Sequence, residues 1–301
     1  MYGMNRPYVI EHTVLFIFSR EENIMKSTRV TAVLLASALL LAGCSSSSSG
    51  STADSNSDSD TFRVGMECNY APFNWSTGEA NDTTQPLADG GYCDGYDVVI
   101  AEKMADALGK KVEIHKLDWD NLILNLNNNQ IDAVIAGMTD TPEREKQIAF
   151  TDPYYESEEV IIVKKDSKYK DATDIQDFSG AKLVGQMNTI YDEVIDQIKG
   201  VQHEQAASDF PAAILSLNKG AVDGVVSELP VANGVVSSNP DLTIVRFAEG
   251  HNFDADTTVS IGVRKSDTDL KKKLNAALSD ISTDERNQLM EAAVERQPAN
   301  D

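Results

Sequence analysis

After residue 61, short apolar runs alternate with segments that have a helical pattern of apolar residues. Residues 62–66 form such a run, and a helical pattern begins with Asp97 as its N-cap, runs to Leu108 and ends at Gly109. Strands separated by helices predict parallel sheets that are covered on both faces, so the predicted fold class is α/β. Further strands are expected at 112–114, 131–136, 161–163, 183–185, 224–227 and 242–245, and further helices at 120–127, 270–278, 285–294 and from Thr141 onward.

The chain begins with a long segment that lacks this alternation. Residues 25–43 combine a basic start, an apolar run from Val30 to Leu41 and small residues before Cys44. The apolar run has about half of the ~20 residues that cross a bilayer, so it indicates a cleaved signal peptide rather than a membrane span. The sequence LAGC at the cleavage site is typical of a lipobox. Cys44 is therefore predicted to carry a lipid anchor.

The segments on both sides of the signal peptide are expected to lack a fold. Residues 1–24 fit no export signal, and we interpret them as a misassigned extension upstream of Met25. Residues 44–61 are rich in serine and aspartate and lack the apolar residues that a core requires, which predicts a disordered tether. A lipid anchor with a tether would hold the folded part at the extracytoplasmic face of the cell membrane. Ser45 after the cysteine favours a Gram-positive-type cell.

The composition excludes some partners. A net charge of −22 argues against nucleic acid and anionic membrane surfaces. Three cysteines are too few for a disulfide scaffold, and no Cys/His cluster suggests a metal, so neither a metal nor a cofactor is predicted. Cys68 and Cys93 lie in the exported part, where oxidation to a disulfide is possible. A hairpin from residues 73–75 would place Cys93 nearer Phe73 than Cys68, which favours two buried free thiols.

The end of the strand expected at 131–136 carries residues suited to an anion, and ligands bind at such strand ends in α/β sheets. Gly137 permits close approach of the backbone, Thr139 offers a hydroxyl, and a helix begins at residues 141–142 with free N–H groups. Arg144, one turn later, adds a planar fork of donors that matches a carboxylate. On spacing alone, an ion pair between Arg144 and a neighbouring acid on a solvated face is an equal alternative. The acids available for that pair are Asp140 and Glu143.

Four stretches of the chain resemble a known family. They are RVGMECNYAPFNW, GYDVVIAEKMADALGKKVE, DWDNLILNLNNNQIDAVIAGMTDTPEREKQIAFTDPYYES and, more loosely, AVDGVVSELPVA. From Thr61 to about Arg264 the chain resembles the polar amino-acid-binding proteins of ABC importers, solute-binding protein family three. The resemblance implies a monomeric extracellular binding protein, not an enzyme, that captures a free amino acid and delivers it to the permease of an ABC transporter.

The resemblance also implies an architecture. The family has a two-lobed periplasmic-binding-protein-like fold of type II, in which two crossover strands form a hinge. Carried over to this chain, lobe one comprises residues 62–157 and 256–301, and lobe two comprises residues 158–255. The crossings fall near residues 159–160 and 254–258. Closure of such lobes is a population shift that is driven by ligand contacts with both lobes.

The family's contacts with the backbone of its ligand map onto both lobes. An arginine and two donors in lobe one hold the α-carboxylate, a threonine in lobe two assists them, and an acid in lobe two holds the α-ammonium. Two positions depart from the family, because its usual Gly-Thr-Thr loop reads Asn-Thr-Ile here and because a glutamate replaces the usual aspartate. The corresponding residues are Gly137, Thr139, Arg144, Thr189 and Glu228.

The resemblance further implies how the ligand side chain is held. Tyr70 falls on the aromatic residue that covers it, Trp119 on the opposite wall, and Glu67 on a position at its distal end, while Trp75 lies either nearby or in the core. An acid beside two aromatic rings suits a cationic or amide-bearing side chain. This favours a polar, and in particular a basic, L-amino acid. A simple structural role for Glu67 is nearly an equal alternative.

An enzyme on the same fold is the alternative function. Some relatives of these binding proteins are cyclohexadienyl (prephenate or arogenate) dehydratases that use a carboxylic acid as proton donor, and Glu228 keeps this alternative open. The combination of Arg144 with an acid, together with the lipobox, favours transport. Residues 282–286 replace the family's usual Asp-Gly-Thr turn, so the resemblance does not establish how the last helix packs.

Overall fold

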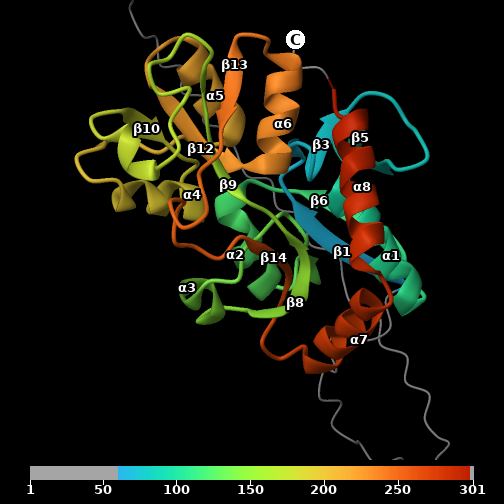
Figure 1. The fold of residues 1–301 in the computed structure, drawn as a ribbon. Coiled ribbons are helices and arrows are strands. Elements are labelled where there is room, and N and C mark those ends of the chain that lie inside the picture. The colour runs from blue at the N-terminus through green and yellow to red at the C-terminus, as the bar shows by residue number, and fades with distance from the viewer. Residues whose placement is uncertain (1–59, 299–301) are drawn as a thin grey trace, which may run out of the picture. The chain divides into compact units, whose positions relative to one another are not determined.

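The computed structural model describes residues 60–298. The predicted signal peptide, the lipid-carrying Cys44 and almost all of the tether lie outside the described residues. Within 60–298 the strands form two sheets of five strands and one sheet of four strands (Figure 1). None of the helices in this part of the chain has the length and hydropathy of a membrane span.

The first sheet is built around β1 (Thr61–Met66). β1 pairs in parallel with β6 (Lys111–Lys116) and with β7 (Ala133–Val134), as the alternating pattern predicts. β14 (Thr258–Val263) pairs in antiparallel fashion with β7 and with β8 (Ala149–Glu156). Apolar side chains of these strands are completely buried, among them Val64, Val134 and Ile261.

The second sheet has the strand order β11, β10, β12, β9 and β13. β10 (Lys182–Val184) pairs in parallel with β11 (Gln202–His203) and with β12 (Gly224–Glu228). β9 (Glu159–Lys164) runs antiparallel to β12 and to β13 (Leu242–Val245).

The expectation of wholly parallel sheets is wrong for β14 and β9. Both are the first strand after a change of sheet: the chain passes from β8 to β9 through residues 157–158, and from β13 to β14 through residues 246–257. A parallel neighbour requires a crossover within the same sheet. The connections before β9 and β14 instead pass from one sheet to the other. No crossover within one sheet therefore makes β9 or β14 parallel to its neighbours.

The small sheet follows β1 directly. Its strand order is β2 (Asn69–Tyr70), β3 (Asn74–Thr77), β5 (Tyr92–Asp94) and β4 (Gln85–Pro86), and all of its pairings are antiparallel. Glu67 therefore lies in the short connection between β1 of the first sheet and β2 of the small sheet.

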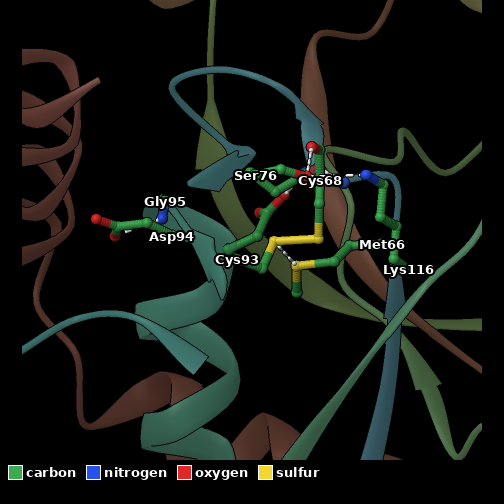
Figure 2. The surroundings of a disulfide bond; sticks show 9 residues. Met66, Cys68, Ser76, Cys93, Asp94, Gly95 and Lys116 are labelled. Carbon is green, nitrogen blue, oxygen red and sulfur yellow. Dashed lines mark hydrogen bonds between the residues drawn. A yellow bond between two sulfur atoms is a disulfide. The ribbon is translucent and has the colours of Figure 1, made fainter. Parts of the chain in front are cut away.

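Cys68 and Cys93 form a disulfide, so the prediction of two free thiols is wrong (Figure 2). The expected hairpin pairing is present, because Trp75 lies opposite Asp94. However, Cys68 has a left-handed backbone with φ of 53° in the turn between β1 and β2. This turn brings the Cα atoms of the two cysteines to 5.7 Å. A prediction from hairpin register alone could not include that turn.

Three long helices pack together beside the first sheet. α1 (Tyr96–Leu108) contacts both α7 (Thr268–Ser279) and α8 (Thr283–Arg296) (Figure 1). α1 ends at Gly109 in the left-handed conformation, as predicted. Its N-cap is Gly95, and the prediction that Asp97 caps the helix is wrong: Asp97 lies in the first turn and is completely buried.

The remaining helices are shorter and carry or flank the strand ends. Thr141 caps α3 as predicted, since its side chain accepts a hydrogen bond from the backbone N of Arg144. The expected helix at 120–127 begins with a 3₁₀ turn, Trp119–Asn121, before α2. The short helices are α2 (Leu122–Asn127), α3 (Pro142–Glu145), α4 (Ile190–Glu193), α5 (Phe210–Asn218) and α6 (Leu229–Ser238), with further 3₁₀ turns at Ile175–Phe178 and Val194–Gln197.

Candidate ligand-binding site

Strand ends from both five-stranded sheets meet around one cavity. β1 leads to Glu67, β7 leads to Gly137, and β10 leads to Gln186. We call the residues that follow strands of the first sheet, together with Tyr70 of the small sheet that continues from β1, the first-sheet side. The residues that follow strands of the second sheet form the second-sheet side. The structure brings together most of the residues predicted from the sequence: Glu67, Tyr70, Trp119, Gly137, Thr139, Arg144 and Thr189 all line this cavity.

Arg144 provides the positive charge of the first-sheet side. Its Nη1 donates to the carbonyl of Thr139 over 2.7 Å, and its guanidinium lies over the ring of Trp119 at 5.1 Å from the centroid. Its Nη2 donates to the carbonyl of Asn188, a residue of the second-sheet side, over 3.0 Å. Burial lowers the pKa of Arg144 from its usual value. The alternative ion pair with Asp140 or Glu143 does not form, because these bonds direct the guanidinium to backbone carbonyls.

A buried network supports the loop that starts at Gly137. Gly137 has a left-handed backbone with φ of 61°, and its N–H donates to Tyr154 Oη over 2.9 Å. Tyr154 Oη donates in turn to Asp97 Oδ1 over 2.7 Å, and Asn74 Nδ2 donates to Asp97 Oδ2 over 2.7 Å. Burial raises the pKa of Asp97 to about 7, although the hydrogen bonds from Tyr154 and Asn74 lower it. The helical pattern in the sequence singled out Asp97 as a helix cap. Nothing in the neighbouring sequence indicates that it accepts hydrogen bonds from Tyr154 and Asn74.

Glu228 is located at the end of β12 and is completely buried. Its Oε1 accepts a hydrogen bond of 2.6 Å from the hydroxyl of Tyr70, which belongs to the first-sheet side. Burial raises the pKa of Glu228 to about 7, while the nearby hydroxyls of Tyr70 and Tyr191 act in the opposite direction. Glu228 therefore stands behind Tyr70 rather than in the cavity wall itself.

Glu67 is the buried acid in the cavity wall, with 7% of its surface exposed. Its carboxylate accepts from Nε2 of Gln186 at 3.2 and 3.3 Å, across the cavity from the second-sheet side. Burial raises the pKa of Glu67 to about 7, against the hydrogen bond from Gln186, and the charges of Asp209, Asp118 and Asp120 add to the rise. Neither Glu67 nor Glu228 forms an ion pair with a lysine, arginine or histidine within residues 60–298.

Asn188 links the two sides through Trp119 and Arg144, which both line the cavity. Its carbonyl accepts from Trp119 Nε1 over 3.0 Å as well as from Arg144, and its Nδ2 donates to Asp120 Oδ1 over 2.7 Å. Its backbone is left-handed with φ of 60°, a conformation that glycine and asparagine tolerate best. Asparagine can therefore occupy the position where the resembling family has glycine.

The structure also shows where Thr189 and Trp75 lie relative to the cavity. Thr189 is buried beside the cavity, and its hydroxyl donates to the carbonyl of Gln186 over 2.7 Å. Trp75 is buried in the apolar core and does not line the cavity. The lining residues that the sequence analysis missed are Ala136, Gln186, Ile190, Tyr191, Phe210 and Val226. Three of them could have been found from the sequence, because Ala136 follows β7, Gln186 follows β10 and Val226 lies within β12. The other three have no such signal in the local sequence.

Residues 62–293 match the bacterial extracellular solute-binding proteins, family 3. The chain belongs to this family. Members of this family are solute-binding proteins and not enzymes, so the dehydratase alternative is set aside.

Similar proteins come from several bacteria. A probable histidine-binding protein of Neisseria gonorrhoeae is 29% identical over 84% of this chain and 89% of its own length. The ABC transporter arginine-binding protein 1 of Escherichia coli (strain K12) is 31% identical, over 76% of this chain and 88% of its own length. The arginine-binding extracellular protein ArtP of Bacillus subtilis (strain 168) is 28% identical, over 85% and 93%.

Solved structures show the same architecture. The arginine-bound form of truncated ArgBP from T. maritima is 31% identical with a TM-score of 0.63, and the match covers 74% of this chain and 97% of that one. An ancestral arginine-binding protein bound to glutamine is 31% identical with a TM-score of 0.65, over 77% and 97%. These neighbours have the two-lobed type II fold, so the predicted fold class is confirmed.

Proposed function

We propose that this chain binds a free cationic L-amino acid in the cavity and delivers it to the permease of an ABC importer. The observation that carries the proposal is the arrangement of charge around one cavity. Arg144 is the cation in the cavity wall, Glu67 is a buried acid in the same wall, and Glu228 is a buried acid directly behind Tyr70; neither acid has an ion-pair partner among the described residues. A basic amino acid has one carboxylate and two cationic groups, and this set complements one guanidinium and two carboxyls.

Each group of the ligand has a partner in this proposal. The α-carboxylate binds Arg144 and the loop from Gly137 to Thr139, with Thr189 on the opposite side. The α-ammonium lies against Tyr70 and is held by the charge of Glu228, which stands directly behind the Tyr70 hydroxyl. The side chain passes Tyr70 and Trp119 and ends at Glu67. Contacts of one ligand with both sides would favour the closed arrangement of the lobes.

The similar proteins support a basic ligand. The names of the relatives in Escherichia coli and Bacillus subtilis give arginine as the ligand, and one solved relative is bound to L-arginine. Glutamine is also bound by an ancestral arginine-binding protein. We therefore place arginine first and an amide side chain second.

The proposal extends to the parts of the protein around the cavity. Lobe one would comprise residues 62–157 and 256–301 and lobe two residues 158–255, with the hinge at the two changes of sheet. A lipid on Cys44 and the tether at 44–61 would hold a monomeric binding protein at the extracytoplasmic face of the membrane, of Gram-positive type. Residues 1–24 would not be translated, and protein produced from Met25 should be processed before Cys44.

Calorimetry with three matched ligands tests the binding proposal. Arginine should bind. Citrulline has the same length without the positive charge and should bind about tenfold or more weakly, because Glu67 then has no ion-pair partner. Agmatine lacks the α-carboxylate and should bind weakly or not at all, because Arg144 loses its partner. Failure of every free amino acid to bind, or equal binding of arginine and citrulline, would contradict the proposal.

A further inference from the structure

Cys68 lies one residue after Glu67 and is held at three of its atoms; Figure 2 shows its attachments to Ser76 and Cys93. Its backbone N donates to Asn74 Oδ1 over 2.7 Å, its carbonyl accepts from Ser76 Oγ over 2.8 Å, and its Sγ is bonded to Cys93. Its left-handed backbone, with φ of 53°, is unfavourable for a residue with a side chain and persists where the surroundings impose it. The two hydrogen bonds and the disulfide hold Cys68 in this backbone conformation.

The attachments of Cys68 also determine the backbone of Glu67. Each peptide group is planar, so one hydrogen bond orients the whole plane. The plane before Glu67 contains the carbonyl of Met66, which accepts from the N of Leu117 over 3.0 Å. The plane after Glu67 contains the N of Cys68, which donates to Asn74. With both planes held, only the side-chain torsions of Glu67 remain free.

The partners of Cys68 are themselves immobilised. Asn74 is completely buried, and its Nδ2 donates to Asp97, so its Oδ1 faces Cys68. Cys93 is also completely buried, and its Sγ lies 3.6 Å from Met66 Sδ. By contrast, the carboxylate of Glu67 has its partner Gln186 on the second-sheet side. We call the Cys68–Cys93 disulfide together with Asn74 the Cys68 clamp.

We propose that the Cys68 clamp is a positioning element for Glu67 and sets the preference of the site for cationic over neutral side chains. The inference rests on the proposed function and assigns to the disulfide a role in selectivity. A charged partner that is held in place before the ligand arrives loses less conformational entropy on binding. A neutral side chain forms no ion pair with Glu67 and gains little from the clamp.

The test compares wild type with two variants that release the clamp in different ways. Cys68→Ser/Cys93→Ser removes the covalent attachment, and Asn74→Ala removes the acceptor for the N of Cys68 while the disulfide remains. Calorimetry with arginine and citrulline at a temperature well below unfolding should show the arginine affinity reduced about tenfold in the double variant and less in Asn74→Ala. The citrulline affinity should change little in the double variant. Asn74→Ala also removes a hydrogen bond to Asp97 behind the Gly137 loop, so it should weaken both ligands by a common factor. The ratio of the arginine affinity to the citrulline affinity should fall in both variants.

A matched control separates selectivity from lost stability. Leu278→Ala creates a cavity in the buried face of α7, away from the ligand cavity, and should leave the ratio at its wild-type value. If wild type prefers arginine and the ratio is unchanged in either clamp variant that folds, the clamp proposal is overturned and the proposed function stands. If wild type binds no amino acid, the proposed function itself fails. A reduced ratio in the clamp variants and not in Leu278→Ala supports the clamp.

Discussion

The two sides of the cavity hold their charges in different ways. On the first-sheet side Arg144 is only partly buried and donates to two backbone carbonyls. On the second-sheet side Glu228 is completely buried, and its hydrogen-bond partner Tyr70 comes from the first-sheet side. Burial opposes charge on both, lowering the pKa of Arg144 and raising that of Glu228 to about 7.

The consequence of burial differs between the two groups. An arginine side chain starts so far above neutrality that a lowered pKa leaves it charged. A carboxyl with a pKa of about 7 is divided between its neutral and charged forms at neutral pH. The difference teaches that Arg144 offers a permanent charge, whereas the buried acids acquire full charge when a cation arrives. Four changes would break or sharpen this comparison.

Arg144→Ala should have the largest effect, with a loss of about a hundredfold or more in affinity for every amino acid. The α-carboxylate would be desolvated without its cationic partner. Lys146→Ala is a matched control, because Lys146 is exposed and its ammonium pairs with the neighbouring Glu143 outside the cavity. Calorimetry measures the affinities, and circular dichroism should show both variants folded. Wild-type affinity in Arg144→Ala would remove the carboxylate assignment.

Glu228→Gln should weaken all amino acids alike, by roughly ten- to a hundredfold. The amide retains the size of the side chain and cannot supply the charge that the α-ammonium requires. Arginine and citrulline, measured in parallel, should therefore lose similar factors. A loss confined to arginine would place Glu228 at the side-chain end instead.

Glu67→Gln should weaken arginine by about tenfold and should affect citrulline much less. Glu67 would meet only the end of the side chain, so the ranking of ligands changes while the shared backbone contacts remain. The same two titrations used for Glu228→Gln provide the comparison. Parallel losses for both ligands would remove the case for a basic substrate.

The smallest effect concerns the pH dependence of stability without ligand. Folding raises the pKa of Glu67, Asp97, Glu159 and Glu228 from 4.5 or 3.8 to about 7. The folded state thus holds more protons than the unfolded chain between these values, and the stabilisation is lost as pH rises through 7. The melting temperature should therefore be a few degrees higher at pH 5.5 than at pH 7.5.

The double variant Glu67→Gln/Glu228→Gln is the control for that pH effect. The amides do not titrate, so the difference in melting temperature between the two pH values should shrink. The net charge of −22 also becomes less negative on acidification, and the comparison with the variant separates this general effect from the two carboxyls. A wild type that melts lower at pH 5.5 would contradict the raised pKa values.

Local patterns in the sequence determined the class of fold and much of the first-sheet side. The alternation of strands and helices predicted α/β, and Thr141 followed by Pro142 located the start of α3. Gly109 ended α1 as expected. Caps, glycine stops and apolar periods involve neighbours within a few positions of the chain, so they can be recognised without tertiary structure. Gly137 and Arg144 lie within one such local segment.

Only the tertiary structure decided which distant residues meet. Tyr70 and Glu228 are 158 positions apart, and Glu67 and Gln186 are 119 apart, yet each pair joins the two sides of the site by a hydrogen bond. The disulfide between Cys68 and Cys93 depends on one left-handed residue, and Asp97 became part of a buried network instead of a helix cap. Such contacts follow from how the sheets and helices pack together. A local period or spacing constrains each element and leaves the packing between elements undetermined.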